Sequence, residues 1–143
     1  MCNTRDVIPP ETIQAYRETD YRIDGEILLV LRIDEFNESL ATLYKINRVN
    51  SCAYITACNP FGQNIGEPAN TRLQDKLISE LKSRGLTFFK GSGKHPVSDW
   101  LGEPSYLVLD ISLEAAKSLG VQYEQNEIVW CRSDAVPQLG LLR

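Results

Sequence analysis

The sequence predicts an α+β fold in which a single mixed or mainly antiparallel sheet carries about three helices. Strand-like segments follow one another without an intervening helix near both ends of the chain, within 19–33 and within 121–143. Helix-like segments separate most of the other strands, and the clearest of them carries Leu73, Leu77, Ile78 and Leu81 on one stripe. Consecutive strands that lack a crossover pair antiparallel, because a parallel connection needs a dozen or more residues.

The size and composition predict one soluble domain over 1–143, in which residues 1–10 form a flexible arm. The chain has 143 residues, of which 43% are hydrophobic and 24% charged, and its net charge is −4. This charge gives no long-range attraction to phosphates, so nucleic acid is an unfavoured partner. The start lacks the pattern of a signal peptide and no stretch is long and apolar enough to span a bilayer. We therefore expect a cytoplasmic protein with no membrane contact.

In chain order, the first half is expected to form a helix over 11–18, two strands within 19–33, a helix over 37–47 and a strand over 51–58. The pair Asp24-Gly25 is a two-residue signal for a tight hairpin between the two strands. The second strand of this hairpin, 27–33, is the more continuously apolar one and is expected near the middle of the sheet. Asn37 is placed to cap the second helix.

The second half is expected to form a helix from Asn70 or Thr71, a strand over 86–90, a long loop over 91–104, a strand over 105–111, a helix over 112–120 and two strands within 121–143. Gly85 is placed to end the first of these helices. Ser112 and Gly120 have the positions of an N-cap and a stop signal for the other. The loop stretch GSGK, from Gly91, lacks the glycine and the hydroxyl residue that a phosphate-binding loop requires.

Neither a metal nor another cofactor is expected. The four cysteines have no C-x-x-C spacing, and the chain has a single histidine, His95. Free and mostly buried thiols in a reducing compartment are the favoured interpretation. Cys58, at a strand end, is the best placed nucleophile, with His95 as its base, but buried structural cysteines are much commoner.

Polar residues gather in loops that follow strands, where a rigid sheet fixes the backbone and leaves side chains free for a ligand. Asn59 precedes Pro60, which biases it away from right-handed helical angles and orients its amide. The alternative is that Asn59 only bonds loop backbone. Arg72, expected in the first turn of its helix, could bind an anion together with free N–H groups, or could lie exposed or pair with Glu67.

Five stretches resemble, in this order, a small bacterial domain family of unknown function: ITACNP (55–60), ANTRLQ (69–74), WLGEPSYLVL (100–109), SLEAAKSLG (112–120) and QNEIVW (125–130). The resemblance covers roughly residue 15 to the end of the chain and implies a single cytoplasmic domain without an established activity. The chain departs from the family pattern at Cys58, where an aromatic residue is usual, and at Glu124, where glycine is usual. The positions to which it points are Thr56, Asn59, Pro60, Asn70, Glu103, Gln125, Asn126 and Trp130.

The candidate ligand-binding residues are Thr56, Asn59, Asn70, Arg72, Glu103, Gln125 and Asn126. The leading interpretation is a non-enzymatic binding or regulatory domain, in which amides at one end of the sheet recognise a small polar molecule or a protein partner. Amides both donate and accept hydrogen bonds but do not titrate, which suits recognition better than catalysis. One alternative is a small hydrolase or transferase that uses Glu103 or Cys58 with amide oxyanion donors. Another is a protein–protein adaptor in which the amides are structural.

Overall fold

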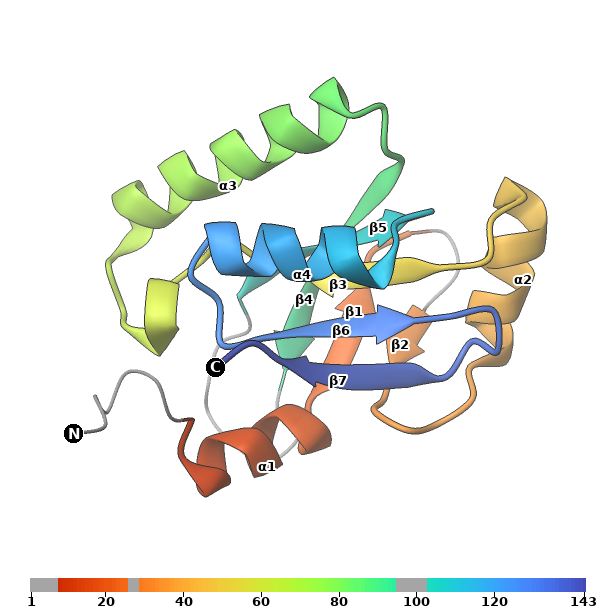
Figure 1. Cartoon of the computed structure of the whole chain (residues 1–143), viewed down its shortest axis with the longest axis horizontal. Helices are drawn as coiled ribbons and strands as arrows, with labels where there is room; N and C mark the ends of the chain where they lie inside the picture. Colours follow the sequence, from red (N-terminus) through yellow and green to blue (C-terminus); the bar gives the residue numbers. More distant parts are fainter. Residues whose placement is uncertain (1–7, 26–28, 95–102) are drawn as a thin grey trace.

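The computed structural model describes residues 8–25, 29–94 and 103–143, which form one seven-stranded sheet and four α-helices (Figure 1). The elements are α1 (Pro10–Glu18), β1 (Asp20–Ile23), β2 (Leu29–Leu31), α2 (Glu38–Asn47), β3 (Cys52–Ile55), the 3-10 turn η2 (Pro60–Gly62), α3 (Glu67–Ser83), β4 (Phe88–Lys94), β5 (Pro104–Leu109), α4 (Leu113–Gln122), β6 (Glu127–Cys131) and β7 (Pro137–Leu141). The strand order is β2-β1-β4-β5-β3-β6-β7, and all neighbours pair antiparallel. The predicted α+β class is confirmed, with four helices instead of about three.

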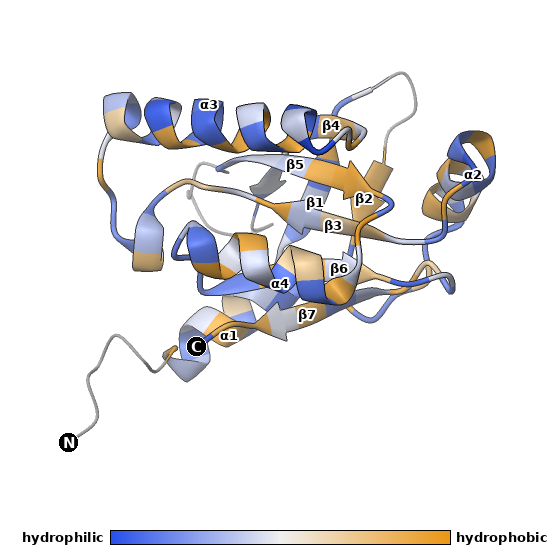
Figure 2. Cartoon of the chain, turned by 45° about the horizontal axis from the view of Figure 1, so that its top comes forward, coloured by the Kyte–Doolittle hydropathy of each residue, from blue (hydrophilic) through white to orange (hydrophobic). Residues whose placement is uncertain are grey.

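The sheet separates two apolar cores, and alternation along β3 assigns residues to each. Cys52 and Tyr54 contribute to the core that α2 covers through Leu40 and Tyr44. Ala53 and Ile55 point to the opposite face. There the core is completed by buried leucines of α3 and α4, namely Leu77, Leu81 and Leu119. Figure 2 shows hydrophilic residues along the side of α3 that faces away from the sheet. No helix of the described residues has the length and apolar content needed to cross a membrane.

The sheet curls so that its two ends approach each other. The backbone N–H of Asp34, after β2, donates to the carbonyl of Pro137 in β7 at 2.8 Å. Asn37, which caps α2 as predicted, also donates its amide to the Val30 carbonyl at 2.8 Å. The prediction that 27–33 lies near the middle of the sheet is wrong, because β2 is an edge strand. Its apolar character comes from burial under α2 in the curled sheet, while the Asn37 amide binds a backbone group of the exposed edge.

Two turns differ from the sequence prediction. The strands β1 and β2 pair as expected, but Ile23 pairs with Leu29, a register that a two-residue turn at Asp24-Gly25 does not allow. This register buries both Ile23 and Leu29 on the core face, and burial outweighs the local turn signal. The GSGK stretch belongs to β4, where it pairs with β1 from Asp20 to Ile23, and is not a loop. His95 and Trp100 lie outside the described residues.

Gly120 does not end α4, which continues to Gln122. A methyl group on Gly120 would overlap the side chain of Leu142 and crowd that of Ile128. The glycine is therefore required for close packing of α4 against the end of the chain. Helix α3 begins at Glu67, earlier than predicted, with Pro68 in its first turn, where proline is well tolerated.

Replacing Gly91 should destabilise the fold, because a methyl group there would overlap the backbone carbonyl of Arg22 in the paired strand β1. We expect Gly91→Ala to lower the free energy of unfolding by about 2–3 kcal/mol, as for other overpacked sites. Gly93→Ala is the matched control on the same strand, since its methyl would lie 3.3 Å from the Thr19 side chain, a tight contact but not an overlap with the backbone. Urea denaturation measures both. Equal stability of the two variants would contradict this role of Gly91.

Candidate functional site

A turn with unusual backbone angles follows β3 and begins the candidate site. Asn59 has a φ of +49° and Phe61 a φ of +55°, both in the left-handed region. Asparagine tolerates this region, whereas phenylalanine needs support from its surroundings. The N–H of Phe61 donates to the Glu124 carbonyl at 2.7 Å, and the Arg143 guanidinium lies over its ring, 4.4 Å from the centroid. Glu124 itself has a φ of +55°, in the left-handed region that favours glycine.

The side chain of Asn59 connects three segments. Its backbone N–H donates to Asn70 Oδ1 at 2.8 Å, and Asn70 Nδ2 donates back to Asn59 Oδ1 at 2.8 Å. The same Oδ1 accepts the Ile65 N–H at 3.3 Å. Asn59 Nδ2 then donates to Glu103 Oε2 at 3.1 Å. Because its oxygen is held by α3, the amide of Asn59 presents a donor to Glu103 in a fixed direction.

A second set of hydrogen bonds fixes the backbone next to Glu103. Thr56 Oγ1 donates to the Pro104 carbonyl at 2.7 Å, and Gln74 Nε2 donates to the same oxygen at 2.6 Å. Gln74 Oε1 accepts the N–H of Ala57 at 2.9 Å. Gln74 was not among the predicted residues, and its position on the apolar stripe of α3, between Leu73 and Leu77, is the signal that could have identified it as buried. Glu103 therefore begins β5 from a well-anchored position.

The two remaining amides bind protein groups on the other side of the turn. Gln125 is buried and donates to the carbonyls of Cys58 and Tyr123 at 3.0 and 3.1 Å. Asn126 Nδ2 donates to the Tyr16 hydroxyl at 3.1 Å, and Asn126 Oδ1 accepts from Arg143 at 2.8 Å. The structure thus brings Thr56, Asn59, Asn70, Glu103, Gln125 and Asn126 to one end of the sheet. Their amides chiefly hold the protein's own backbone and carboxyl groups.

Glu127 is the main residue that sequence reasoning missed. Its Oε2 is buried and has no hydrogen-bond partner within the described residues. Burial and, to a smaller extent, the nearby carboxyl of Glu103 raise its pKa to about 8. Burial also raises the pKa of Glu103, an effect that the hydrogen bond from Asn59 opposes. Alternation with the buried residues Val129 and Cys131 places Glu127 on the core face of β6, and this pattern was visible in the sequence.

Both carboxyl groups line a small inner cavity of about 40 Å³, together with Tyr16, Thr19, Tyr21, Tyr54, Thr56, Gly93 and Ser105. A larger outer cavity of about 610 Å³ adjoins it, since Tyr16, Thr19 and Glu103 line both. The outer cavity lies between α1 and the turn at 59–62, with Ala15 and Phe61 in its wall. A third cavity, of about 530 Å³, borders Glu103 on the side of α3. Glu103 is therefore common to all three.

Arg72 is not part of this arrangement. Because α3 begins at Glu67, Arg72 lies beyond the first turn of the helix, away from the free N–H groups there. Its side chain is exposed and is absent from the lining of the described cavities. The predicted place of Arg72 in the first turn of this helix is therefore wrong, and the alternative that Arg72 lies exposed agrees with the structure.

Cys58 has the surroundings of a structural thiol. It is 3% exposed, and its sulfur lies 3.9 Å from the Pro104 carbonyl oxygen. Burial raises the pKa of the thiol, and the Glu103 carboxyl raises it further. A nucleophilic cysteine needs the opposite effect, so this environment weighs against cysteine chemistry.

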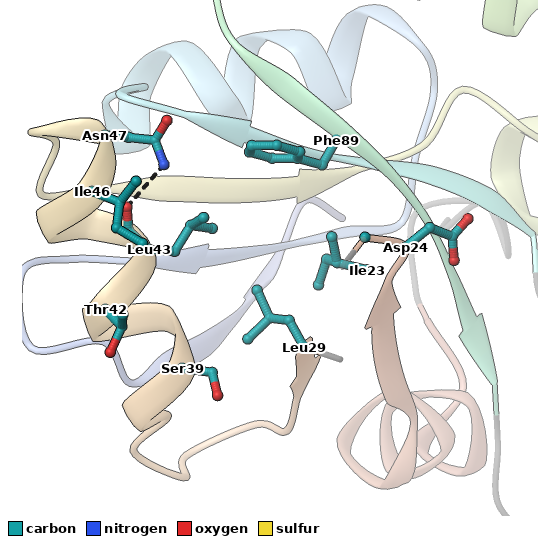
Figure 3. A pocket seen from close by; sticks show the side chains of 10 residues that line it. Ile23, Asp24, Leu29, Ser39, Thr42, Leu43, Ile46, Asn47 and Phe89 are labelled. Atoms are coloured by element: carbon teal, nitrogen blue, oxygen red, sulfur yellow. Dashed lines mark hydrogen bonds between the residues drawn. The ribbon is translucent and has the colours of Figure 1, made fainter. Parts of the chain in front are cut away.

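A separate groove of about 690 Å³ lies between α2 and the sheet (Figure 3). Leu29, Leu43 and Phe89 face its interior, and Asn47 at its rim donates to the carbonyl of Leu43 at 2.9 Å. Asp24 is the single ionisable side chain in its described lining. The groove therefore lacks the converging polar groups that the inner and outer cavities share.

The family described as "Protein of unknown function (DUF3293)" matches residues 55–128, which is more than half of the chain. The chain belongs to this family, and the expected resemblance to a domain family of unknown function is confirmed. No curated protein and no solved structure matched the chain. The matched part runs from Ile55 through Ile128 and therefore contains Asn59, Glu103 and Glu127.

Removing the Asn59 side chain should loosen the site without changing its backbone. Asn59→Gly permits the left-handed conformation but removes the bonds to Asn70, Ile65 and Glu103, so we expect a loss of about 1–3 kcal/mol of unfolding free energy. Asn59→Ala should cost about 1 kcal/mol more, because alanine is strained at this φ. Urea denaturation of both variants separates the two effects. Wild-type stability of Asn59→Gly would show that the amide bonds are not important for the fold.

The buried Glu127 should make the stability fall as pH rises. Between its ordinary pKa, 4.5, and its raised pKa of about 8, the folded protein holds a proton that the unfolded chain has lost. Rising pH therefore favours unfolding by up to about 1.4 kcal/mol per pH unit across this window, and stability from this group is fully present only below about pH 4.5.

Urea denaturation between pH 5 and 8 measures this slope, and Glu127→Gln should flatten it because the amide does not ionise. The control is Glu35→Gln, at an exposed glutamate that should leave the slope unchanged. If Glu127→Gln keeps the wild-type slope, folding does not raise the pKa of the Glu127 carboxyl.

Proposed function

We propose that the chain is a binding domain that holds a small polar molecule in the outer cavity, with the molecule reaching the two carboxyl groups of the inner cavity. The observation that carries the proposal is Glu127 Oε2, a buried atom beside a cavity that has no hydrogen-bond partner in the part of the chain that the structure describes. Such an atom is destabilising unless something binds it, and native proteins seldom leave one unsatisfied. A ligand with hydrogen-bond donors would satisfy it.

The amides act in this proposal as positioning groups. Asn59 and Asn70 are hydrogen-bonded to each other. Asn59 Nδ2 also donates to Glu103 and so restricts the orientation of its carboxyl. Thr56 and Gln74 fix the neighbouring carbonyl of Pro104. A carboxyl held from two sides loses little entropy when a ligand binds, which favours affinity. The free buried thiols of Cys52, Cys58 and Cys131 suit a reducing compartment, and we place this binding domain in the cytoplasm.

A second candidate is acid–base catalysis by the same carboxyls in a hydrolase or transferase. The raised pKa values of Glu103 and Glu127 favour it, because catalytic carboxyls are often tuned toward neutral pH by burial. The two functions differ in what happens to the bound molecule. A binding domain returns its ligand unchanged after prolonged incubation, whereas an enzyme converts it.

A thermal-shift screen with amino acids, amines, sugars and nucleosides tests the binding proposal. Ala15→Trp fills the outer cavity from α1 without removing a polar side chain, and Gln14→Trp places the same group on the exposed side of that helix. We expect some compound to raise the melting temperature of wild type and Gln14→Trp by several degrees but not that of Ala15→Trp, since only binding to the native state stabilises it. A panel that shifts none of the three proteins, or shifts all of them equally, would overturn the proposal.

A further inference from the structure

The inner cavity is acidic and closely lined. Glu103 and Glu127 both line it, and the hydroxyl groups in the described lining belong to Tyr16, Thr19, Tyr21, Tyr54, Thr56 and Ser105. The hydroxyls of Tyr21 and Tyr54 already donate to the backbone carbonyls of Tyr16 and Arg22, at 2.7 and 3.0 Å. They therefore do not bind Glu127 Oε2, which has no hydrogen-bond partner among the described residues. The groups that could still bind a ligand here are chiefly acceptors.

The size of this cavity limits what can enter it. About 40 Å³ of space holds one or a few water-sized groups and excludes a ring or a branched head group. The outer cavity of about 610 Å³ is large enough for the rest of a small molecule, and its wall includes the apolar surfaces of Ala15 and Phe61. The two cavities share Tyr16, Thr19 and Glu103, so one molecule can extend through both.

Resting on the function proposed above, we propose that the ligand is a primary amine whose ammonium group enters the inner cavity between Glu103 and Glu127 while its apolar body occupies the outer cavity. An ammonium group donates three hydrogen bonds and accepts none, which matches a cavity that offers carboxylate acceptors. It also supplies the positive charge that two adjacent carboxylates lack. Arg143 forms no ion pair with either carboxyl among the described residues: Nη1 donates to Asn126, the guanidinium lies over Phe61, and Nη2 is buried without a hydrogen bond.

Binding of the ammonium group is coupled to loss of a proton from the Glu127 carboxyl. Without ligand, the Glu127 carboxyl is protonated at neutral pH because it is buried beside Glu103. The ionisable groups around it are Glu103 before β5, Tyr16 on α1, Tyr21 on β1 and Tyr54 on β3, and all three tyrosines have pKa values raised by burial, so they stay neutral. When the ammonium enters, the carboxyl O–H bond of Glu127 breaks, its proton leaves to solvent, and the carboxylate pairs with the cation. Affinity should therefore rise with pH until Glu127 is ionised in the free protein, near pH 8.

Three benzyl compounds test the head group while keeping the same ring. Benzylamine carries a primary ammonium, benzyl alcohol is its neutral analogue of similar size, and benzyltrimethylammonium is a cation whose head is too large for the inner cavity. Calorimetry should show benzylamine binding at least tenfold more tightly than either of the others at pH 7.5. Its heat of binding should differ between two buffers of different ionisation enthalpy, by the amount for release of up to one proton.

Glu127→Gln is the decisive variant, because glutamine has the shape of the protonated acid but cannot ionise. It should reduce benzylamine affinity at least tenfold, abolish proton release, and leave the weak binding of benzyl alcohol unchanged. Glu35→Gln, at an exposed glutamate, should behave as wild type. An unchanged benzylamine affinity in Glu127→Gln would overturn the inference.

Other outcomes separate this inference from the function on which it rests. If benzyl alcohol or a sugar binds as tightly as benzylamine, and Ala15→Trp prevents it, the amine assignment fails while the binding site stands. Stabilisation by Mg²⁺ or Ca²⁺ that Glu127→Gln removes would likewise replace the amine by a metal ion. If Ala15→Trp affects the binding of no compound, both the inference and the proposed function fail.

Discussion

The hydrogen bonds of the Asn59 side chain are the interaction on which the site depends. They tie the end of β3 to α3 through Asn70 and to the start of β5 through Glu103. These segments are distant in the sequence, and the intervening turn is held in a left-handed conformation at Asn59 and Phe61. Without this amide, the carboxyl of Glu103 would lose the donor that fixes its direction. The outer cavity would also lose one of its walls, since Asn59 lines it.

The electrostatic arrangement of the site is unfavourable, although hydrogen bonds hold its backbone firmly in place. Two carboxyl groups face one cavity, one of them is buried without a hydrogen bond, and burial raises the pKa of both. A fold selected for stability alone would place apolar side chains there, as it does two and four residues along β6 at Val129 and Cys131. Local destabilisation of this kind is commonly found where a protein binds or reacts with something. The proposed ligand is the group that removes the conflict.

Several features of this fold and site could be predicted from the sequence, because they depend on local patterns. The apolar stripes of the helices and the caps at Asn37 and Ser112 gave the helices that the structure contains. The asparagine before a proline and the amides near Gln125 indicated the end of the sheet at which these side chains meet. Other features depend on tertiary contacts that no local pattern encodes. The glycine at 120 looked like a helix end but is required by Leu142, which lies far along the chain.

The two carboxyl groups, Glu103 and Glu127, also show that tertiary contacts limit what the sequence alone can predict. Glu103 was identified from its motif, whereas Glu127 looked like an ordinary charged residue at the start of a strand. Its importance follows from the curl of the sheet, which turns the core face of β6 toward the tyrosines of α1, β1 and β3. The sequence alone does not show which buried position will face a cavity. Arg72 is the converse case, since its expected role depended on a helix start that Pro68 places earlier.

The central claim is that two carboxyl groups share a buried cavity and that Glu127 is protonated at neutral pH. Carbon-13 NMR of the glutamate side-chain carboxyls, followed from pH 4.5 to 9, measures this directly, with Glu103→Gln and Glu127→Gln assigning the two signals. The account predicts a midpoint near pH 8 for Glu127 and a midpoint above the ordinary glutamate range for Glu103. If both carboxyls titrate near the ordinary value of about 4.3, the cavity is not acidic in the sense proposed and the account is wrong.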